Sequence, residues 1–427
     1  MSTMPHIAVV VDDEPITPDA PGGAAALVHT HVTLLLDAGF RVSVLVLRDP
    51  DGPRRFETFT REQPERWKTI EQRLTACYVR DLRRKAHRSA PLQSLMRALS
   101  DRATLILDPE PTDVERFAAT VQALGPDALL AVHLVPASLL HGRAYARLAI
   151  GLATRPLTLY DHFDWHWRIK AHRAGRRSWR QRLRHRLTRG WEEHLVKIAD
   201  GVVTGSASEA ATCRRLGARN VVNVPTAFEV PASPPSFTSF PTPPRLVHLG
   251  GMSTTANRLG LGRFLDVVWP EFTRPRPELW VIGSLRGADA TLLERLENDP
   301  DIVTTGFVDD LATVLRPGDL HIVPWEHDTG TRTRVPLALR HGQVLVSTRA
   351  AVACLPEIED GRNAVLVDTL DAMRAELDSL AESTDRRHEL AEAGWRTFLD
   401  AYTHEALRPR IETFFRTVLD ENGAGEA

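Results

Sequence analysis

Short apolar runs recur along the chain, and each is followed by a polar or glycine-containing turn and then by a helical pattern. The first run, 6–11, leads through a glycine-rich loop to a helix predicted at about 24–38 and then to a second run at 41–47. Continuous apolar runs of this length are typical of strands buried in parallel sheets. The alternation returns from 127 to 217 and from 245 to 348. The sequence therefore predicts an α/β protein with doubly wound, Rossmann-like domains.

A proline-rich segment, PASPPSFTSFPTPP at 231–244, interrupts this alternation. Proline lacks the amide hydrogen that a helix interior or an inner strand requires, so a stiff, extended linker is predicted there. We accordingly expect an N-terminal domain over 1–230 and a C-terminal domain over 245–400. The remaining residues, 401–427, are expected to form a helix that packs back on the N-terminal domain.

Composition narrows the class of protein. The 427 residues carry a formal net charge of −2, which argues against a nucleic-acid-binding polycation, and the three cysteines are far apart and predicted to be reduced thiols. The N-terminus lacks the pattern of a signal peptide, and no apolar stretch is long enough to span a membrane, so a cytoplasmic location is expected. Arginine far outnumbers lysine, which is typical of a GC-rich bacterial genome and predicts that arginine would bind any phosphate.

The segment 330–334 has the chemistry of a phosphate site. Gly330 would allow a ligand to approach the backbone, and Thr331 could donate a hydrogen bond to a phosphate. A helix beginning near Thr333 would direct free amide groups at an anion, beside the charges of Arg332 and Arg334. The alternative is a capped surface helix with two solvated arginines.

Further polar and glycine residues follow predicted strands, and ligands of doubly wound sheets bind at the carboxyl ends of the strands. On this basis the further candidate ligand-binding residues, besides 330–334, are Gly22, Gly23, Gly251, Asn257, Arg258, Ser284 and Glu326. The residues predicted on the other side of the site are His133, Asp161, His162 and Asp164. For the histidines, the alternative is a structural role within the fold.

Several segments resemble the GT-B glycosyltransferases, especially the retaining, family-4 type. The segments that carry the resemblance are 246–252, 280–283, 330–348 and 356–367 in the second half, and, more loosely, 22–23 and 191–206 in the first. The resemblance implies two Rossmann-like domains facing a cleft, with the phosphates of a nucleoside diphosphate sugar in that cleft. The C-terminal domain would hold this donor and the N-terminal domain the acceptor. It implies a hexosyltransferase-like enzyme that retains anomeric configuration.

The resemblance also implies roles for single residues. It assigns the candidate ligand-binding residues Gly22, Gly23, Gly251, Asn257, Arg258, Ser284 and Glu326, together with 330–334, to donor binding. His162 matches a histidine that contacts the donor sugar, so the predicted catalytic set is Asp161, His162 and Arg334. His133 and Asp164 are predicted to line the acceptor and sugar pocket. The family usually needs no metal, so neither a metal nor another cofactor is expected, and Asp161 with Asp164 is not interpreted as a metal site.

The chain departs from the family at Leu337, where a glutamate usually binds the ribose hydroxyls. A nearby acid, Glu326 or Glu357, could replace that contact, or the ribose could bind more weakly. Loss of catalysis with retention of the fold is the third outcome. A non-catalytic sugar-nucleotide-binding or regulatory protein is therefore the alternative to an active transferase.

The stretch 168–189 contains ten arginine and lysine residues and no acidic residue. Trp165, Trp167 and Trp179 are interleaved with it. Three interpretations stay open: a solvated helix face whose apolar stripe packs in the core, an anionic membrane surface, and a nucleic acid. The partners predicted are a sugar nucleotide and an acceptor. A peripheral contact with the inner membrane face is a further alternative, and no nucleic acid is expected.

Overall fold

The computed structural model describes residues 4–17, 23–85, 108–149, 155–163, 165, 179–273, 275–328 and 330–423. The chain divides into two compact units, which are described separately. Unit 1 comprises Met1–Thr226 and Leu407–Ala427, and unit 2 comprises Ala227–Ala406. Three predicted features, Gly22, Asp164 and the part of the basic run at 168–178, lie outside the described residues.

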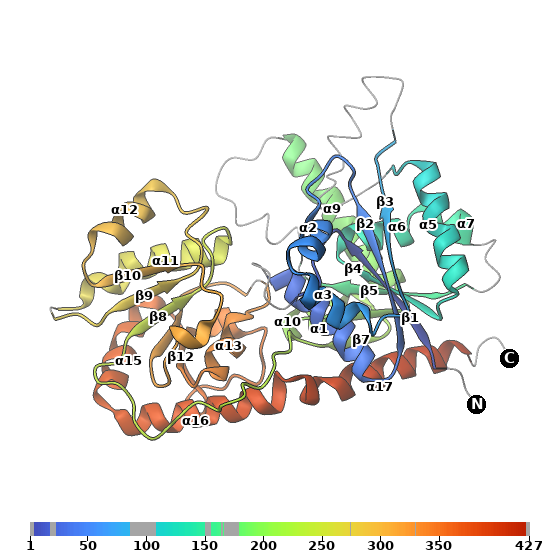
Figure 1. Cartoon of the computed structure of the whole chain (residues 1–427). Coiled ribbons are helices and arrows are strands. Elements are labelled where there is room, and N and C mark those ends of the chain that lie inside the picture. The colour runs from blue at the N-terminus through green and yellow to red at the C-terminus, as the bar shows by residue number, and fades with distance from the viewer. Residues whose placement is uncertain are drawn as a thin grey trace. The chain divides into compact units, whose positions relative to one another are not determined.

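Unit 1 is built on a seven-stranded parallel sheet with the order β3-β2-β1-β4-β5-β6-β7 (Figure 1). An inner strand, β1, pairs with β2 on one side and β4 on the other, and Ile7 to Val11 have no exposed surface. The chain order reverses between β1 and β4, which is where doubly wound sheets bind ligands. The strands are β1 His6–Asp12, β2 Arg41–Arg48, β3 Ala76–Asp81, β4 Ala128–Val132, β5 Leu157–His162, β6 Gly201–Thr204 and β7 Val221–Asn223.

Helices join the strands of unit 1, and local signals set several of their ends. One helix, α5, begins with a proline in its first turn and ends at Gly125, whose φ is 54°. Another, α10, begins where the Ser206 side chain accepts a hydrogen bond from the Glu209 amide. The helices are α1 Gly23–Asp37, α2 Arg55–Glu62, α3 Pro64–Glu71, α5 Pro111–Leu124, α6 Leu134–Leu140, α7 Arg143–Ala149, α9 Trp179–Ile198 and α10 Ala207–Leu216.

The last helix, α17 His404–Gly423, belongs to unit 1 from Leu407 onwards. Its Phe415 ring packs 5.8 Å from the ring of Phe40. A side chain at Gly201 would come within 2.8 Å of the Phe414 ring, so the start of β6 lies directly against this helix. No helix in the described part of the chain is long and apolar enough to cross a membrane.

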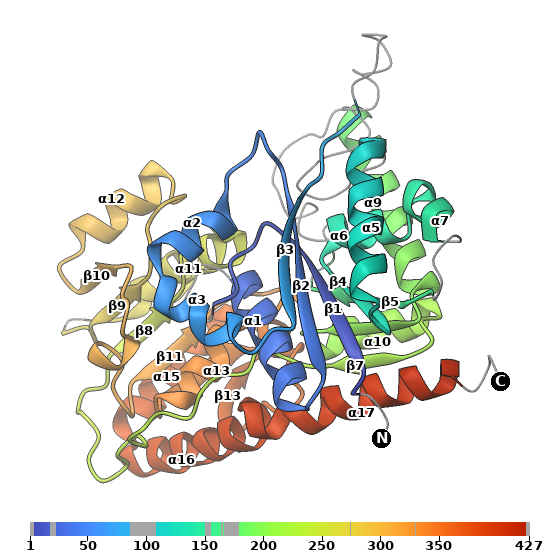
Figure 2. The same ribbon diagram turned by 45° about the vertical axis from the view of Figure 1, so that its right-hand side comes forward.

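Unit 2 repeats the architecture with a six-stranded parallel sheet in the order β10-β9-β8-β11-β12-β13 (Figure 2). The strand β8 occupies the place that β1 has in unit 1. The predicted pair of doubly wound parallel sheets is thus confirmed. The strands are β8 Leu246–Leu249, β9 Leu279–Ile282, β10 Ile302–Gly306, β11 Leu320–Val323, β12 Val344–Thr348 and β13 Ala364–Val367. The helices are α11 Thr255–Val267, α12 Ala290–Asn298, α13 Arg334–Arg340, α14 Arg349–Val352, α15 Leu370–Glu382 and α16 Thr384–Ala401, with short 3₁₀ turns at Trp269–Glu271 and Leu311–Thr313.

The proline-rich segment is docked on unit 2. Phe240 is buried and stacks on His388 with 4.0 Å between the ring centroids. The buried Arg387 donates to the carbonyl oxygens of Pro241 and Gly318 at 2.9 and 3.2 Å. At Gly318, whose φ is 80°, a Cβ would lie 2.3 Å from the Phe240 ring. The segment has no regular secondary structure, as its prolines predict, but it is packed against unit 2.

Replacing Phe240 with Ala should destabilise unit 2 by about 3 kcal/mol, because the change removes a buried aromatic ring and leaves a cavity. Thermal unfolding followed by calorimetry would measure the loss. Thr238→Ala, at an exposed position of the same segment, is the matched control and should stay within about 0.5 kcal/mol of the wild type. Equal stability of the Phe240 variant and the control would contradict the docking described here.

Candidate functional site

Two glycine loops meet at the carboxyl ends of β8 and β9. Gly250 has a φ of 137° and donates to the Ile282 carbonyl at 2.8 Å. A Cβ at Gly283, whose φ is 134°, would lie 2.8 Å from the carbonyl carbon of Gly250. The two backbones therefore touch, and only glycine fits at these positions.

The predicted donor residues near these loops hold the backbone in place. The Asn257 amide donates to the Gly251 carbonyl at 3.0 Å, and Arg258 donates to the carbonyls of Met252 and Gly287. The carbonyl of Ser284 accepts from the Met252 amide at 2.8 Å. These side chains shape a rigid loop edge at the carboxyl end of β8.

The side chain of Arg334 is buried at the same edge. Its Nη1 donates to Nε2 of His248 at 3.1 Å and to the Leu249 carbonyl at 3.2 Å. Among the residues that the structure describes, no carboxylate lies within ion-pair distance of it. Burial, followed by the charge of Arg332, lowers the pKa of Arg334 to about 9. A buried cation without a counter-charge is costly, so this position favours an anion.

The histidines beside Arg334 are held in their neutral form. Burial lowers the pKa of His248 well below its ordinary value, and the charge of Arg334 lowers it further. His321 shares a hydrogen bond of 2.9 Å with Gln343, and burial lowers its pKa to about 3. The region around Arg334 therefore carries net positive charge at neutral pH.

The remaining residues of the predicted phosphate segment lie just before α13. Gly330 has a φ of 70°, and Arg332 is buried with 7% of its surface exposed. The helix begins at Arg334, and Thr333 makes no side-chain cap hydrogen bond. Thr331 is partly buried. Arg332 and Arg334 are thus both buried, whereas the alternative of a capped surface helix predicted solvated arginines.

The two acids proposed to compensate for Leu337 interact with other side chains, and Leu337 itself has apolar neighbours. Leu337 packs against an apolar cluster that includes Leu249 and Ile282. Glu326 forms an ion pair of 3.5 Å with Arg263, and Glu357 accepts a hydrogen bond of 3.2 Å from Tyr402. The surroundings of Leu337 are therefore apolar.

In unit 1, Asp161 and His31 form a buried pair. His31 Nδ1 lies 2.5 Å from Asp161 Oδ2, its Nε2 lies 3.1 Å from the Val224 carbonyl, and neither side chain is exposed. Burial alone would lower the pKa of His31, but Asp161 outweighs it and the pKa is raised above 6.5. The pair links α1 to the carboxyl end of β5.

His162 is enclosed by two acids that also have almost no exposed surface. Its Nδ1 lies 3.7 Å from Glu209 and its Nε2 lies 3.9 Å from Glu192. Burial opposes a charge on His162, but Glu209 and then Glu192 outweigh it, so the pKa of His162 is raised. Because Asp161 and His162 have no exposed surface, neither could touch a sugar unless the side chains that cover them moved.

His133, which is predicted to line the acceptor pocket, is partly exposed. It follows β4 directly, has the left-handed φ of 71°, and donates its amide to the Asp161 carbonyl at 3.1 Å. Its ring meets Phe163 edge to face at 5.1 Å. Non-glycine residues rarely adopt this conformation, and those that do are found most often at functional sites.

Sequence reasoning missed four buried residues that define these clusters: His31, Glu192, Glu209 and His248. One signal was available for Glu192. It lies four residues after the buried Thr188 and three before the buried Leu195, on the face of α9 that packs into unit 1. Nothing local marks His31 or Glu209, because their partners are more than 40 residues away in the chain.

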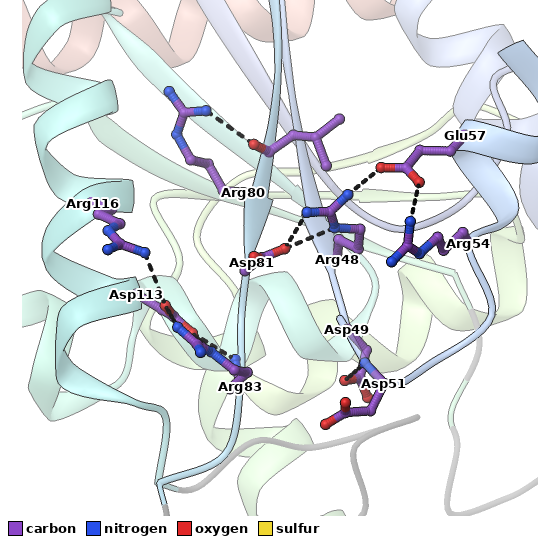
Figure 3. Close-up of polar contacts among 11 residues, drawn as sticks. Arg48, Asp49, Asp51, Arg54, Glu57, Arg80, Asp81, Arg83, Asp113 and Arg116 are labelled. Atoms are coloured by element: carbon purple, nitrogen blue, oxygen red, sulfur yellow. Dashed lines mark hydrogen bonds and ion pairs between the residues drawn. The ribbon is translucent and has the colours of Figure 1, made fainter.

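An open cavity of about 560 Å³ lies between the edge strand β3 and α5. Most of its charged side chains are already paired: Arg48 with Asp81 and Glu57, and Asp113 with Arg83 (Figure 3). This pairing indicates a structural surface. Within the described ranges, no three His, Cys, Asp or Glu side chains come together as metal ligands would.

Comparison with known proteins gives a family match for part of the chain and a fold for the whole of it. Residues 243–383 match the model of the glycosyl transferases group 1 family. Comparison with curated proteins gave no match. Sucrose-phosphate synthase from Thermosynechococcus elongatus is similar in structure, with 15% identity, a TM-score of 0.65, and coverage of 98% of this chain and 100% of that chain.

Two further solved structures are similar along nearly their whole length. HepE from Anabaena, solved with UDP and with UDP-glucose, has 14% identity, a TM-score of 0.61, and coverage of 96% of this chain and 99% of that one. A TarM variant from S. aureus, solved with fondaparinux, α-GlcNAc-glycerol and UDP, has 10% identity, a TM-score of 0.64, and coverage of 97% and 100%. The chain therefore has the GT-B fold. The match to the glycosyl transferases group 1 family is confined to residues 243–383.

The raised pKa of His31 predicts a pH-dependent stability. A folded-state pKa above 6.5 contributes stability that is fully present below about pH 6.5 and is lost as the pH rises through the folded pKa. The stability advantage of the wild type over His31→Asn, which keeps a donor but cannot ionise, should therefore narrow with rising pH. Urea unfolding from pH 5.5 to 8.5 measures it. His194→Asn, at an exposed position, is the control. If the difference in unfolding free energy between the wild type and His31→Asn does not change with pH, the charged pair is contradicted.

Proposed function

We propose that the protein transfers a sugar from a nucleoside diphosphate sugar to an acceptor, and that Arg334 holds the donor diphosphate. The single observation that carries this proposal is the buried guanidinium of Arg334, which no carboxylate in the described part of the chain neutralises. Arg332, buried two residues earlier in the segment before α13, adds a second positive charge. The group 1 glycosyl transferase domain contains both residues.

The chemistry of glycosyl transfer explains why such a cation would be useful. As the bond between the sugar and the diphosphate breaks, negative charge builds up on the leaving oxygens. A fixed cation placed there stabilises the transition state more than the ground state. The planar fork of arginine fits phosphate oxygens, so we propose that Arg334 and Arg332 do this without a metal ion.

Unit 1 is proposed to bind the acceptor through the carboxyl end of its sheet. His133 is the best-supported contact, because it is partly exposed and its left-handed backbone fixes the ring beside β4. We also propose retention of anomeric configuration, which rests on the resemblance of 246–367 to retaining enzymes. The NMR coupling constant of the anomeric proton in donor and product tests it.

A non-catalytic protein that binds a sugar nucleotide is the second candidate. The observation that favours it is Leu337, which packs on apolar side chains where the resemblance implies a ribose-binding acid. Incubation with UDP-, GDP- and dTDP-sugars separates the two candidates. Release of nucleoside diphosphate supports the enzyme, whereas binding of a donor without turnover in the presence of varied acceptors supports the second candidate.

We further propose that the acceptor lies at an anionic membrane surface, to which α9 binds. Leu183 and Leu187, one turn apart, are 40% and 39% exposed, and Trp179 is 63% exposed. The helix carries no acidic residue from Trp179 to Trp191, and Arg182 and Arg186 lie exposed between the apolar positions. An exposed apolar stripe flanked by arginines is typical of helices that lie in a lipid interface. The alternative of a stripe packed in the core does not fit these exposures.

Arg334→Ala should weaken binding of UDP, GDP or dTDP, whichever the wild type binds, and lower kcat/KM by ~10–100-fold. This range follows from the ~1.5–3 kcal/mol of a charge-assisted hydrogen bond. Calorimetry with and without EDTA measures the affinity. Arg295→Ala, which removes a partly exposed arginine of α12, is the control and should bind normally. Unchanged binding by the Arg334 variant would refute the proposed diphosphate site, and loss of binding with EDTA would refute the metal-free mechanism.

Replacing Leu183 and Leu187 together with Ser should lower binding to vesicles of phosphatidylglycerol and phosphatidylcholine by about tenfold, through lost apolar burial. Co-sedimentation measures this binding, and vesicles of phosphatidylcholine alone should bind the wild type weakly. Ile198→Ser, at another exposed position of α9, is the matched control. Absence of vesicle binding at low salt, or preferential binding to RNA, would contradict a membrane role for this helix.

A further inference from the structure

The hydrogen-bond partners of Arg334 differ from those of another buried arginine in unit 2. Arg245 is bound at two nitrogens by Asp319, at 2.8 and 2.5 Å, so its charge is neutralised within the protein. Arg334 is bound instead by His248 and by a backbone carbonyl. Both arrangements hold the guanidinium in place, but only the second leaves its positive charge available to a ligand.

His248 can hold Arg334 only in one state. A guanidinium only donates hydrogen bonds, so Nε2 of His248 must accept and the ring must be neutral. The surroundings favour this state, because His248 is fully buried in β8 and faces the charge of Arg334, with His321 as its other titratable neighbour. Among the residues that the structure describes, no carboxylate contributes to the pKa of His248.

The Leu249 carbonyl gives Arg334 a second fixed acceptor. It belongs to the last residue of β8, directly before the loop where Gly250 and Gly283 touch. Both acceptors therefore come from adjacent residues of one central strand, and neither can move without disturbing the sheet. The guanidinium is thus held by an inner strand of the unit 2 sheet.

We propose that His248 is a positioning residue that orients Arg334 for binding the diphosphate of the donor while leaving the charge of Arg334 unneutralised. This inference rests on the proposed function, because it assumes that Arg334 meets an anion. It assigns β8 a part in donor binding through a side chain that lies entirely within the protein. A carboxylate at position 248 would hold the arginine equally well but would cancel its charge.

Three substitutions of His248 test the proposal, with UDP, GDP and dTDP as probes in calorimetry on the full chain. His248→Gln places an amide oxygen near the position of Nε2 and should bind within about threefold of the wild type. His248→Leu keeps the bulk, removes the acceptor and should weaken binding about tenfold, equivalent to ~1.4 kcal/mol. His248→Glu keeps an acceptor, adds a negative charge and should weaken binding at least as much as Leu.

The same His248→Leu change is then made in the Arg334→Ala protein. If His248 acts through Arg334, the tenfold loss disappears in that background, because the effects of coupled residues are not additive. A loss of the same size in both backgrounds, or failure of Gln to restore binding, would overturn the positioning role. Normal binding by His248→Glu would overturn it as well.

The proposed function fails in a different way. It fails if Arg334→Ala binds the probe as tightly as the wild type, or if the wild type binds none of the three nucleotides. The thermal midpoint of each variant identifies a change that merely unfolds unit 2. A loss of affinity is interpreted only for variants that keep the wild-type thermal midpoint. If His248→Leu is unstable, the affinities of His248→Gln and His248→Glu, whose side chains are similar in size, are compared instead.

Discussion

Both sheets are wholly parallel, and this constraint determines where the chemistry can lie. A parallel strand cannot turn back into its neighbour, so each one is followed by a crossover that begins at the same edge of the sheet. The polar loops after β4, β5, β8 and β11 are brought to the carboxyl edges of the two sheets in this way. The candidate residues of each unit are therefore gathered by topology from segments far apart in the sequence.

Histidine is used in opposite charge states in the two units. In unit 1, carboxylates surround His31 and His162 and favour their protonated forms. In unit 2, burial and arginine keep His248 and His321 neutral. His31 and His162 of unit 1 thus have acidic partners, whereas Arg334 of unit 2 has none among the described residues. This difference supports assigning the phosphate-binding role to unit 2.

Sequence patterns predicted most of the fold, because buried parallel strands are continuous apolar runs and their turns contain glycine. They also made Arg334 a candidate, since an arginine just after a strand-and-loop pattern is visible locally. They did not predict that the Arg334 side chain is buried, or that it contacts His248, which lies 86 residues earlier in the chain. Apolar spacing in 179–195 correctly indicated a helix but not the face that packs. Glu192 lies on the buried face of this helix and Leu183 on the exposed one. Helical spacing could not show this, because the partner of Glu192 is His162, which belongs to β5.

The docked proline-rich segment changes what should be regarded as the smallest folding unit of the C-terminal half. The family match begins at residue 243, after Phe240 and Pro241. A fragment cut at that point would expose the ring of His388 and leave Arg387 without the Pro241 carbonyl. An autonomous unit would instead have to start near Ala227, where Phe228 also donates its amide to the Tyr402 carbonyl. A segment with the composition of a spacer is thus an integral layer of the domain that follows it, and homology boundaries alone would remove it.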